Sequence, residues 1–546
     1  MGAFLLGRAP DLAWLIAPLV AHLAFSWIGF NPTDDGWLQA VARRLADGEV
    51  PHRDFIFVRP ALSAILQVPL VWWAGEHVIA MSRLWGWLTL GAVCWLWTGR
   101  VAAGTAPITR HALYLVSLAL SAHTFPVMAW HSIDGLLLAS LAVVMAARDT
   151  AGSRRVAFML VGLAALCRQN FGLFAPWLML AVGGPPGRWF SAAFWSLVPP
   201  LLYFAAMGVM GAGADFVHQI TATGSGFLFL VGVQGFFTEP WFLSALAGGF
   251  ALGWVQRRTS AAWPRWFAFL WCAGALAFAL SQSPWWYRHA SFALHGLVIG
   301  LGAAWAGALS KSDRLHVVAA AGLAWTVAIS LGTNHPALAT GVLILALWRL
   351  LQLSPVPAAD RPPPRILLPL TAAVAVAALT FARHRFPYLD RPANELTSDA
   401  GTALRGAAGL RTNAVTQATL ADLQTLTARL EAENRPHVIL TDFAAVWIRS
   451  PRPNPLPCEW PQETELGYDR ALFLRVFRAL RDLPPEARVV VQKYLIADGG
   501  WQQTPMPAQT SYYFVQNWVS SHCSKRGETA YFVLYAPPSR EAMKSP

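Results

Sequence analysis

The sequence predicts a polytopic α-helical membrane protein of about thirteen transmembrane helices, followed by a C-terminal α/β domain outside the membrane. The chain of 546 residues is 55% hydrophobic and only 13% charged, whereas soluble domains carry about 25% charged residues. Apolar runs of about 15–20 residues recur through the first two thirds of the chain, as membrane-spanning helices require. From residue 383 onward the apolar runs shorten and polar residues become more frequent. The net charge of +12 lies largely in short loops, which does not indicate nucleic-acid binding.

Thirteen apolar segments are candidate spans. The first run lacks a small-residue cleavage site, so we interpret it as a retained anchor. Residues 60–75 are expected to form an interfacial or re-entrant helix, residues 156–182 two short helices that meet at a CRQN tip, and residues 213–232 an external loop. The expected spans are 12–30, 79–99, 111–128, 133–147, 156–167, 170–182, 190–210, 240–256, 264–281, 290–309, 315–332, 337–353 and 366–382.

Arginine and lysine residues in the connections set the expected orientation. Positive residues favour the cytoplasmic side of a bacterial-type inner (plasma) membrane, which puts the N-terminus inside and the tail on the external, periplasmic side. The predicted domains are therefore a transmembrane module over 1–382, with its first external loop over 31–75, and a soluble external α/β domain over 383–546.

The predicted external domain alternates helix and strand patterns. TLADLQTLTARLEAEN and YDRALFLRVFRALRDL have helical periodicity, whereas HVILTDFAAVWI, ARVVVQKYLI and TAYFVLYAPP have strand character. Cys458 and Cys523 lie in this region and would either pair as a disulfide or remain free, because spacing alone cannot supply the distance between them.

The stretch NPTDDGWLQAVARRLADGEVPHRDF, residues 31–55, follows the first span and is unusually rich in charge. Trp37, Leu38, Val41 and Leu45 recur at helical spacing, which predicts an amphipathic helix on the membrane surface. Acidic residues at its start suit the N-terminal end of a helix dipole, and Thr33 or Asp34 could provide the cap.

This loop resembles the first external loop of GT-C superfamily glycosyltransferases, which include the protein O-mannosyltransferase and aminoarabinose-transferase relatives. The shared pattern is a span ending in an acidic pair, a surface helix of the form A-x-x-L-x-x-G, then P-x-R-D, then R-P before an apolar helix. The resemblance covers most of the chain in layout, and in residues mainly 31–62, 130–150 and 160–180. It implies a membrane enzyme that takes a sugar from a polyprenyl-phosphate carrier on the external face.

By this resemblance an acid of the first loop is the catalytic base. Asp34 matches best and Asp35 is the next candidate, although members of the family commonly carry Asp-Glu at these two positions. Asp134, at the external start of a predicted span, corresponds to a second acid that faces the same cavity in similar enzymes. The alternative for all three is a role as helix caps only.

The substrate-binding candidates carry charge or aromatic rings near the same face. Arg53, Asp54 and Arg59 belong to the first loop, where a salt bridge within the loop is an equally good explanation. Arg168 and Gln169, at the CRQN tip, match the L-x-K/R-x-x-G context in which similar enzymes hold lipid phosphate. Tyr287, Arg288 and His289 lie where the family holds phosphate or sugar, with an aromatic belt as the alternative.

No cofactor is required by any motif. A divalent cation, Mg²⁺ or Mn²⁺, would suit the carboxylates of Asp34, Asp35 and Asp134, but no spacing demands one. The expected partners are a polyprenyl-phosphate-linked sugar donor, membrane lipids, and a lipid, glycan or protein acceptor, with no nucleic acid. Two other function classes remain open: a polytopic transporter or lipid-carrier flippase, which would spread ionisable groups through the bilayer, and a non-catalytic membrane scaffold, which would keep them apart.

Overall fold

The computed structural model describes residues 13–123, 127–222, 224–258, 274, 284–329, 334–353, 364–440, 443–463, 465–497, 500–505 and 513–537. The chain divides into two compact units, and each is discontinuous in sequence. Unit 1 comprises Met1–Ala24, Leu84–Leu202 and Leu228–Arg383, and unit 2 comprises Phe25–Arg83, Tyr203–Phe227 and His384–Pro546. Most of the predicted first loop and the C-terminal region therefore belong to the same unit.

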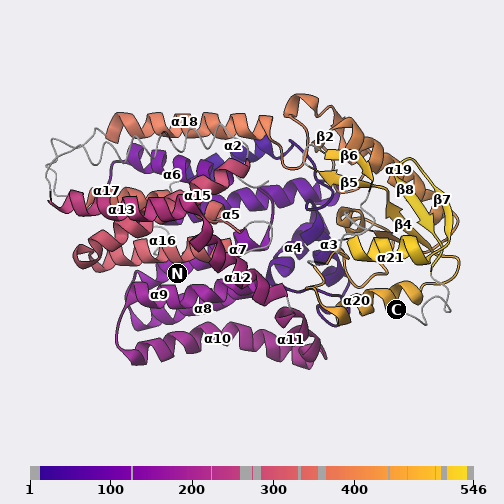
Figure 1. Cartoon of the computed structure of the whole chain (residues 1–546), viewed down its shortest axis with the longest axis horizontal. Helices are drawn as coiled ribbons and strands as arrows, with labels where there is room; N and C mark the ends of the chain where they lie inside the picture. Colours follow the sequence, from indigo (N-terminus) through magenta and orange to yellow (C-terminus); the bar gives the residue numbers. More distant parts are fainter. Residues whose placement is uncertain are drawn as a thin grey trace. The chain divides into compact units, whose positions relative to one another are not determined.

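Unit 1 is a bundle of helices (Figure 1). Its helices cover the predicted spans, except that the span predicted at 264–281 lies almost wholly outside the described residues. The helices that form it wholly or in part are α2 (Ala13–Phe25), α5 (Val78–Val101), α6 (Pro107–Ala122), α7 (His131–Ala146), α8 (Ala151–Cys167), α9 (Phe174–Val182), α10 (Pro186–Val209), α12 (Gly224–Thr238), α13 (Pro240–Arg258), α15 (Pro284–Trp305), α16 (Lys311–Ala328), α17 (Thr340–Gln352) and α18 (Pro364–Arg385), with the short 3-10 turns η2 (Gln169–Leu173), η3 (Ala306–Ala308) and η4 (Pro336–Ala339).

Helices α13 and α15 pack through small residues. Gly249 and Gly253 of α13 and Gly296 and Gly300 of α15 each form a G-x-x-x-G pair. A side chain at Gly249 would meet the backbone of Leu297, and one at either α15 glycine would meet the backbone of α13. The missing side chains let the two backbones approach closely, which is how helices associate where no hydrophobic effect drives them together.

Four helical segments of the described residues are long and apolar enough to cross a membrane: Gly75–Val101, Pro186–Val209, Tyr287–Ala308 and Leu367–Arg385. Two of them are scarcely covered by protein, with 17% of the α10 window and 28% of the α18 window buried. Both lie at the margins of the bundle in Figure 1. Their outer faces carry large exposed apolar side chains, including Phe190, Phe194 and Leu201 of α10. Faces of this kind are stable against lipid and not against water.

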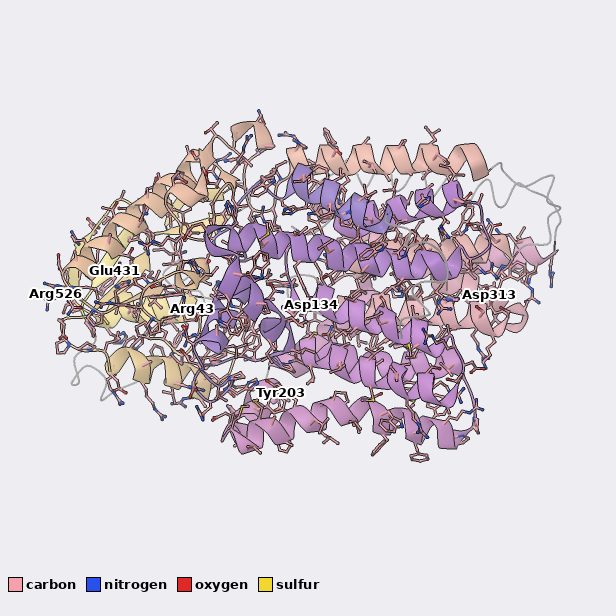
Figure 2. All side chains as sticks on the ribbon, turned by 180° about the vertical axis from the view of Figure 1, so that it is seen from behind. Arg43, Asp134, Tyr203, Asp313, Glu431 and Arg526 are labelled. Atoms are coloured by element: carbon pink, nitrogen blue, oxygen red, sulfur yellow. The ribbon has the colours of Figure 1, made fainter. Side chains whose placement is uncertain are left out.

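Charged side chains in the described part of unit 1 lie near helix ends or in connections. One end of the bundle is called the arginine-rich end below. There, Lys311 at the start of α16 forms an ion pair with Asp149, which precedes α8. Arg349 of α17 forms an ion pair with Asp313 of α16 at the same end. At the other end, here the Asp134 end, Tyr287 at the start of α15 donates to Leu120 O at the end of α6. Figure 2 shows Asp134 and Asp313 at opposite ends of the bundle.

The C-terminal part of unit 2 contains a four-stranded sheet in the order β3-β4-β8-β7. Strand β3 is parallel to β4, β4 is antiparallel to β8, and β8 is antiparallel to β7. The buried residues Val438, Leu440, Val489 and Val491 share a core with apolar residues of α20 and α21. The strands are β1 (Ser398–Asp399), β2 (Arg411–Thr412), β3 (His437–Leu440), β4 (Arg488–Gln492), β5 (Tyr494–Ala497), β6 (Gly500–Pro505), β7 (Lys525–Glu528) and β8 (Phe532–Tyr535), and the helices are α19 (Ala414–Ala432), α20 (Arg470–Arg481) and α21 (Phe514–His522), with the 3-10 turns η6 (Ala393–Glu395), η7 (Ala400–Thr402) and η8 (Ala444–Ile448).

The first loop forms α3 (Trp37–Ala46), α4 (Leu62–Trp73) and the turn η1 (Gly75–His77). At 12 residues α4 is about 18 Å long, too short to cross a hydrocarbon core of about 30 Å. The apolar face of α3, expected to lie against the membrane surface, is instead covered by protein, because most of α3 is buried within unit 2. Trp37 stacks on Trp460 with ring centroids 5.4 Å apart, so the C-terminal region covers the apolar face of the helix.

Two further expectations need correction. The helix α3 begins after Gly36, which has a φ of 84° and provides no side-chain cap, so neither Thr33 nor Asp34 caps it. Residues 213–232 form α11 (Gly213–Thr221) and most of α12 instead of a loop. Gly costs a helix only about 1 kcal/mol per residue, and the apolar residues between the glycines of this stretch outweigh that cost.

Candidate active site

The turn over residues 31–36 holds the two acids of the first loop. The Asn31 side chain accepts from Thr33 N at 2.9 Å, and Asn31 O accepts from Asp35 N at 2.9 Å. The turn ends at Gly36, where a Cβ would lie 2.7 Å from Ile448 Cδ1 and 2.8 Å from Ala445 Cβ. Only glycine fits this position, because the backbone has a positive φ and the C-terminal region packs directly on it.

Asp35 is fully engaged by Arg83. Its Oδ2 accepts from Arg83 Nη2 at 2.7 Å and its Oδ1 from Arg83 Nε at 3.3 Å. The side chains of Arg83 and Asp35 are only 5% and 2% exposed. Arg83 also donates to Ser26 O and Gly29 O, each at 2.7 Å, so the same guanidinium ties the end of the first helix to the acidic turn. Asp35 is therefore placed as a structural anchor.

Asp34 lies in a different environment. It is half-buried, its Oδ2 accepts from the Tyr388 hydroxyl at 2.6 Å, and Asn31 Nδ2 lies 3.4 Å from the same oxygen. A half-buried carboxylate held by a phenol keeps access to a ligand while its orientation is fixed. Of the two adjacent acids, Asp34 is thus the one that can take up a proton from a substrate.

Asp390 is a buried acid that the sequence did not single out. It accepts hydrogen bonds from Phe30 N at 3.0 Å, Thr412 Oγ1 at 3.0 Å and Asn413 Nδ2 at 2.6 Å. Burial raises the pKa of this carboxyl, and the hydrogen bonds from Asn413 and the others oppose that shift. Asp390 joins the residue before the acidic turn to the C-terminal region, two residues after Tyr388.

The remaining candidates of the first loop make ion pairs within unit 2. Arg59 forms a bidentate pair with Glu465, at 2.5 and 2.6 Å, and lies over the Trp37 ring. Arg53 pairs with both carboxylate oxygens of Asp54 at the surface, at 2.8 and 2.9 Å. The salt bridge expected within the loop therefore describes Arg53 and Asp54, whereas Arg59 pairs with an acid of the C-terminal region.

His52 precedes this pair and is completely buried. Its Nδ1 lies 3.2 Å from Gln219 Oε1, and its Nε2 lies 3.0 Å from the Tyr203 hydroxyl. Because Gln219 Oε1 also accepts from Phe57 N, the neutral ring with the proton on Nδ1 fits this network. Burial lowers the pKa of His52 to about 4.

Asp134 lies in the first turn of α7 at the Asp134 end of unit 1. Its carboxyl group is 2% exposed and accepts from Trp85 Nε1 at 2.9 Å. The helix starts after Trp130, without a side-chain cap, so Asp134 does not cap it. Ser132, in the same turn, accepts from Arg168 Nη1 at 2.8 Å. The first turn of α7 thus contains Asp134 and also binds the Arg168 side chain through Ser132.

Arg168 stands at the break between two helices, as the CRQN tip predicted. Helix α8 ends at Cys167, Arg168 has extended backbone with φ −158°, and η2 begins at Gln169. The Arg168 side chain is buried, and the next residue but one, Asn170, donates to Thr326 O at 2.7 Å. A buried arginine at a helix end, bonded to Ser132 in the first turn of α7, is a candidate for binding an anion.

Tyr287, Arg288 and His289 occupy the first turns of α15. Tyr287 is completely buried and stacks on His123 with centroids 4.3 Å apart, so it has a helix-packing role. Arg288 and His289 are half-buried, and His289 Nδ1 lies 3.1 Å from Glu239 Oε1. Glu239, between α12 and α13, is a buried acid missed at the sequence level; its signal was a lone acid within the apolar stretch 216–256.

Within the residues that the structure describes, the possible Mg²⁺ or Mn²⁺ site finds no support. The described part of the chain contains no group of three or more His, Cys, Asp or Glu side chains arranged to hold a metal ion. Asp35, one of the three carboxylates considered for Mg²⁺ or Mn²⁺, is already neutralised by Arg83. We therefore assign no step of the chemistry to a metal.

Comparison with protein-family models gave no match, and comparison with curated proteins by sequence gave none either. Among solved structures, the chain is similar to the crystal structure of ArnT from Cupriavidus metallidurans bound to undecaprenyl phosphate, with 12% identity, a TM-score of 0.43, and coverage of 98% of this chain and 100% of that one. It is also similar to the same ArnT in the apo state, with 14% identity, a TM-score of 0.42, and coverage of 97% and 98%. We base the function below on residues of this chain.

Proposed function

We propose that this protein is an integral-membrane glycosyltransferase of the GT-C type that moves a sugar from a polyprenyl-phosphate donor to an acceptor hydroxyl, with Asp34 as the base. The acceptor oxygen forms a bond to the anomeric carbon while the bond from that carbon to the lipid phosphate breaks. The hydroxyl proton passes to Asp34, and polyprenyl phosphate leaves. Direct displacement of this kind inverts the anomeric centre.

The observation that carries the proposal is the unequal treatment of two adjacent carboxylates. Asp35 is neutralised by Arg83, whereas Asp34 is half-buried and oriented by Tyr388. A general base must be reachable by the substrate hydroxyl, whereas an acid with a purely structural role need not be. Asp35 is then a positioning residue that fixes the backbone of the turn.

The leaving phosphate needs positive charge. Arg168 and Arg288 at the Asp134 end provide it in this proposal, because arginine binds phosphate in a planar, bidentate manner. Asp134, with its orientation fixed by Trp85, would contact a sugar hydroxyl. The proposal retains thirteen spans, an external C-terminal region, and a lipid, glycan or protein as acceptor.

The distribution of charge favours an enzyme over a transporter or flippase. Transporters hold ionisable groups and broken helices near the bilayer midplane. In the described helices of unit 1, Asp, Glu, Lys and Arg lie close to the helix ends. The buried charged residues at the Asp134 end include both an acid, Asp134, and an arginine, Arg168, which a passive scaffold would not require.

The test is transfer of radiolabelled sugar from polyprenyl-phosphate donors by the purified full-length protein, comparing Asp34→Asn with the matched control Asp47→Asn. Asp47 belongs to the same loop but pairs with Arg43 at the surface. Loss of a general base lowers kcat by about 10²–10⁴-fold, so D34N should lose transfer while D47N keeps it. Arg168→Gln should lower kcat as well as kcat/KM for the donor, because the charge that Arg168 neutralises grows as the phosphate leaves. Equal transfer by D34N and D47N would rule out Asp34 as the base.

A further inference from the structure

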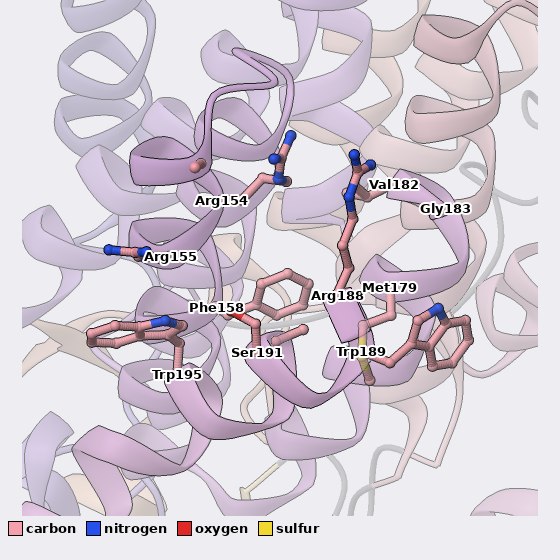
Figure 3. A pocket seen from close by; sticks show the side chains of 12 residues that line it. Arg154, Arg155, Phe158, Met179, Val182, Gly183, Arg188, Trp189, Ser191 and Trp195 are labelled. Atoms are coloured by element: carbon pink, nitrogen blue, oxygen red, sulfur yellow. The ribbon is translucent and has the colours of Figure 1, made fainter. Parts of the chain in front are cut away.

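A cavity of about 120 Å³ lies at the arginine-rich end of unit 1, remote along the helices from Asp134. It is lined by the first turns of α8, the end of α9 and the first turns of α10. Figure 3 shows the guanidinium groups of Arg154 and Arg188 on one side of the Phe158 ring. Arg155 lies over the Trp195 ring, 5.7 Å from its centroid. The cavity would hold about four water volumes of about 30 Å³ each.

The charge around this cavity is strongly positive. Arg154, Arg155 and Arg188 line it, and their near acid is Asp149, which Arg154 shares with Lys311. Helices α8 and α10 both begin here, at Ala151 and Pro186, so the positive ends of two helix dipoles add to the arginines. An anion is the ligand that this combination would bind.

The glycines between α9 and α10 keep room for the cations. Gly183 and Gly184 have φ values of 68° and 127°. A Cβ at Gly183 would lie 2.9 Å from Arg314 Nη2, and one at Gly184 would lie 2.6 Å from Arg188 Cδ. The backbone of this turn is therefore compatible with two arginines folded against it.

The other walls of the cavity are apolar and continue into a lipid-compatible surface. Phe158, Met179 and Trp195 line it. Helix α10 runs away from it with Phe190 and Phe194 exposed, and only 17% of its apolar window is buried. Trp189, in the first turn of α10, also lines the cavity, and tryptophan near the end of an apolar helix is typical of the headgroup level of a bilayer. A phosphate held by the arginines would thus have acyl chains alongside α10.

We propose that this cavity binds the phosphate headgroup of an anionic glycerophospholipid, with Arg155 and Arg188 as its exposed cationic ligands and the apolar face of α10 as the support for its acyl chains. The site is separate from the proposed transfer chemistry. Its occupant is a lipid of the surrounding bilayer, whose function is to fix the ends of α8 and α10 at the membrane boundary.

The test is native mass spectrometry of the full-length protein in an uncharged detergent, titrated with short-chain phosphatidylglycerol or with phosphatidylcholine of the same chains. The variants are Arg188→Gln, Arg155→Gln and both together. Arg258→Gln is the matched control, because Arg258 is exposed and lies over Trp254 at the end of α13. Arg188→Lys keeps the charge but loses the planar fork. Arg155 and Arg188 are exposed, so these variants should fold, and their unfolding midpoints verify it.

We expect phosphatidylglycerol to bind more tightly than phosphatidylcholine, and the double variant to raise the phosphatidylglycerol Kd by about tenfold or more. R188K should fall between wild type and R188Q, and R258Q should bind as wild type does. Equal Kd values for the two lipids, or for the double variant and R258Q, would overturn the proposal. If inorganic phosphate displaces bound phosphatidylglycerol at concentrations as low as those at which the lipid itself binds, the site is one for soluble anions, and the proposal would also be overturned. Because lipid binding is measured without sugar transfer, failure of this proposal is distinguishable from failure of the proposed enzyme activity.

Discussion

We expect replacement of Asp35 by asparagine to destabilise the protein much more than the same replacement of Asp34. The substitution keeps the shape of the side chain but removes the only negative charge that the structure pairs with the buried Arg83 guanidinium in the described residues. Asn31 N, which donates to Asp35 Oδ2 at 2.9 Å, would also face an amide in place of a carboxylate. Both effects destabilise the native turn.

The magnitude follows from burial. Removing one partner of a buried ion pair costs about 3–5 kcal/mol, because the other charge is left uncompensated. The exposures of 2% and 5% place this pair at the buried limit. A domain of 150–250 residues loses about 2–4 °C in Tm for each kcal/mol, so D35N should unfold about 6 °C or more below wild type. Asp34 is half-buried and accepts a hydrogen bond from the Tyr388 hydroxyl, and D34N, which weakens that hydrogen bond, should cost about 1 kcal/mol.

The assay is thermal unfolding of the purified full-length protein in detergent, followed by tryptophan fluorescence, with D47N as the control for a surface acid. Exposed pairs contribute about 0–1 kcal/mol, so D47N should unfold close to wild type. Double replacement of Asp35 by Asn and Arg83 by Met should recover part of the loss, since no unpaired charge remains. If D35N and D47N unfold within 1 °C of each other, the assignment of Asp35 as a structural anchor is wrong.

Three other predictions concern unit 2. Gly36→Ala should lower the free energy of unfolding by about 2–4 kcal/mol, because a positive φ and a clash with the C-terminal region add; Gly48→Ala, whose φ is also positive but whose surroundings are open, measures the backbone contribution alone. His52 stays neutral when folded because its pKa is about 4, against about 6.5 when unfolded. Its contribution is complete above pH 6.5 and is lost as pH falls through 4, so moving from pH 7.5 to 5 should cost about 2 kcal/mol, and urea unfolding of His52→Asn should show that much less pH dependence. Cys458 and Cys523 are free thiols whose pKa values burial raises, the latter to about 11; intact mass after alkylation in denaturant should show both modified without reductant, and a requirement for reductant would contradict the structure.

The helix positions were predictable because apolar runs in a membrane protein are local signals. Each span in the described residues needed only its own composition, and the break at Arg168 followed from a polar tip inside an apolar stretch. The loop predicted at 213–232 was wrong, because this stretch forms α11 and most of α12. Local pattern also found the helix that starts at Trp37, but not its burial.

The differences between neighbouring acids were not predictable, because they depend on partners distant in sequence. Asp35 is set apart from Asp34 by Arg83, 48 residues away, and Asp34 is oriented by Tyr388, 354 residues away. Nothing in the spacing of PYLD shows that its tyrosine and acid would hold the first loop. Glu239 was missed for the same reason, since its partner His289 lies 50 residues further along.

The position of the acidic turn, residues 31–36, is set by residues that lie outside the turn. Asp35 holds the turn to Arg83, and Gly36 lets the C-terminal region close directly over the start of α3. Asp390 fixes the residue before the turn through Phe30 N, and Tyr388, two residues earlier on the same segment, reaches the Asp34 carboxylate. The orientation of the proposed base is therefore determined by the C-terminal region together with the first loop. If the proposed transfer is correct, a tail that supplies Tyr388 and Asp390 in this way is part of the catalytic arrangement, and a chain lacking it would retain Asp34 without the contacts that orient its carboxylate.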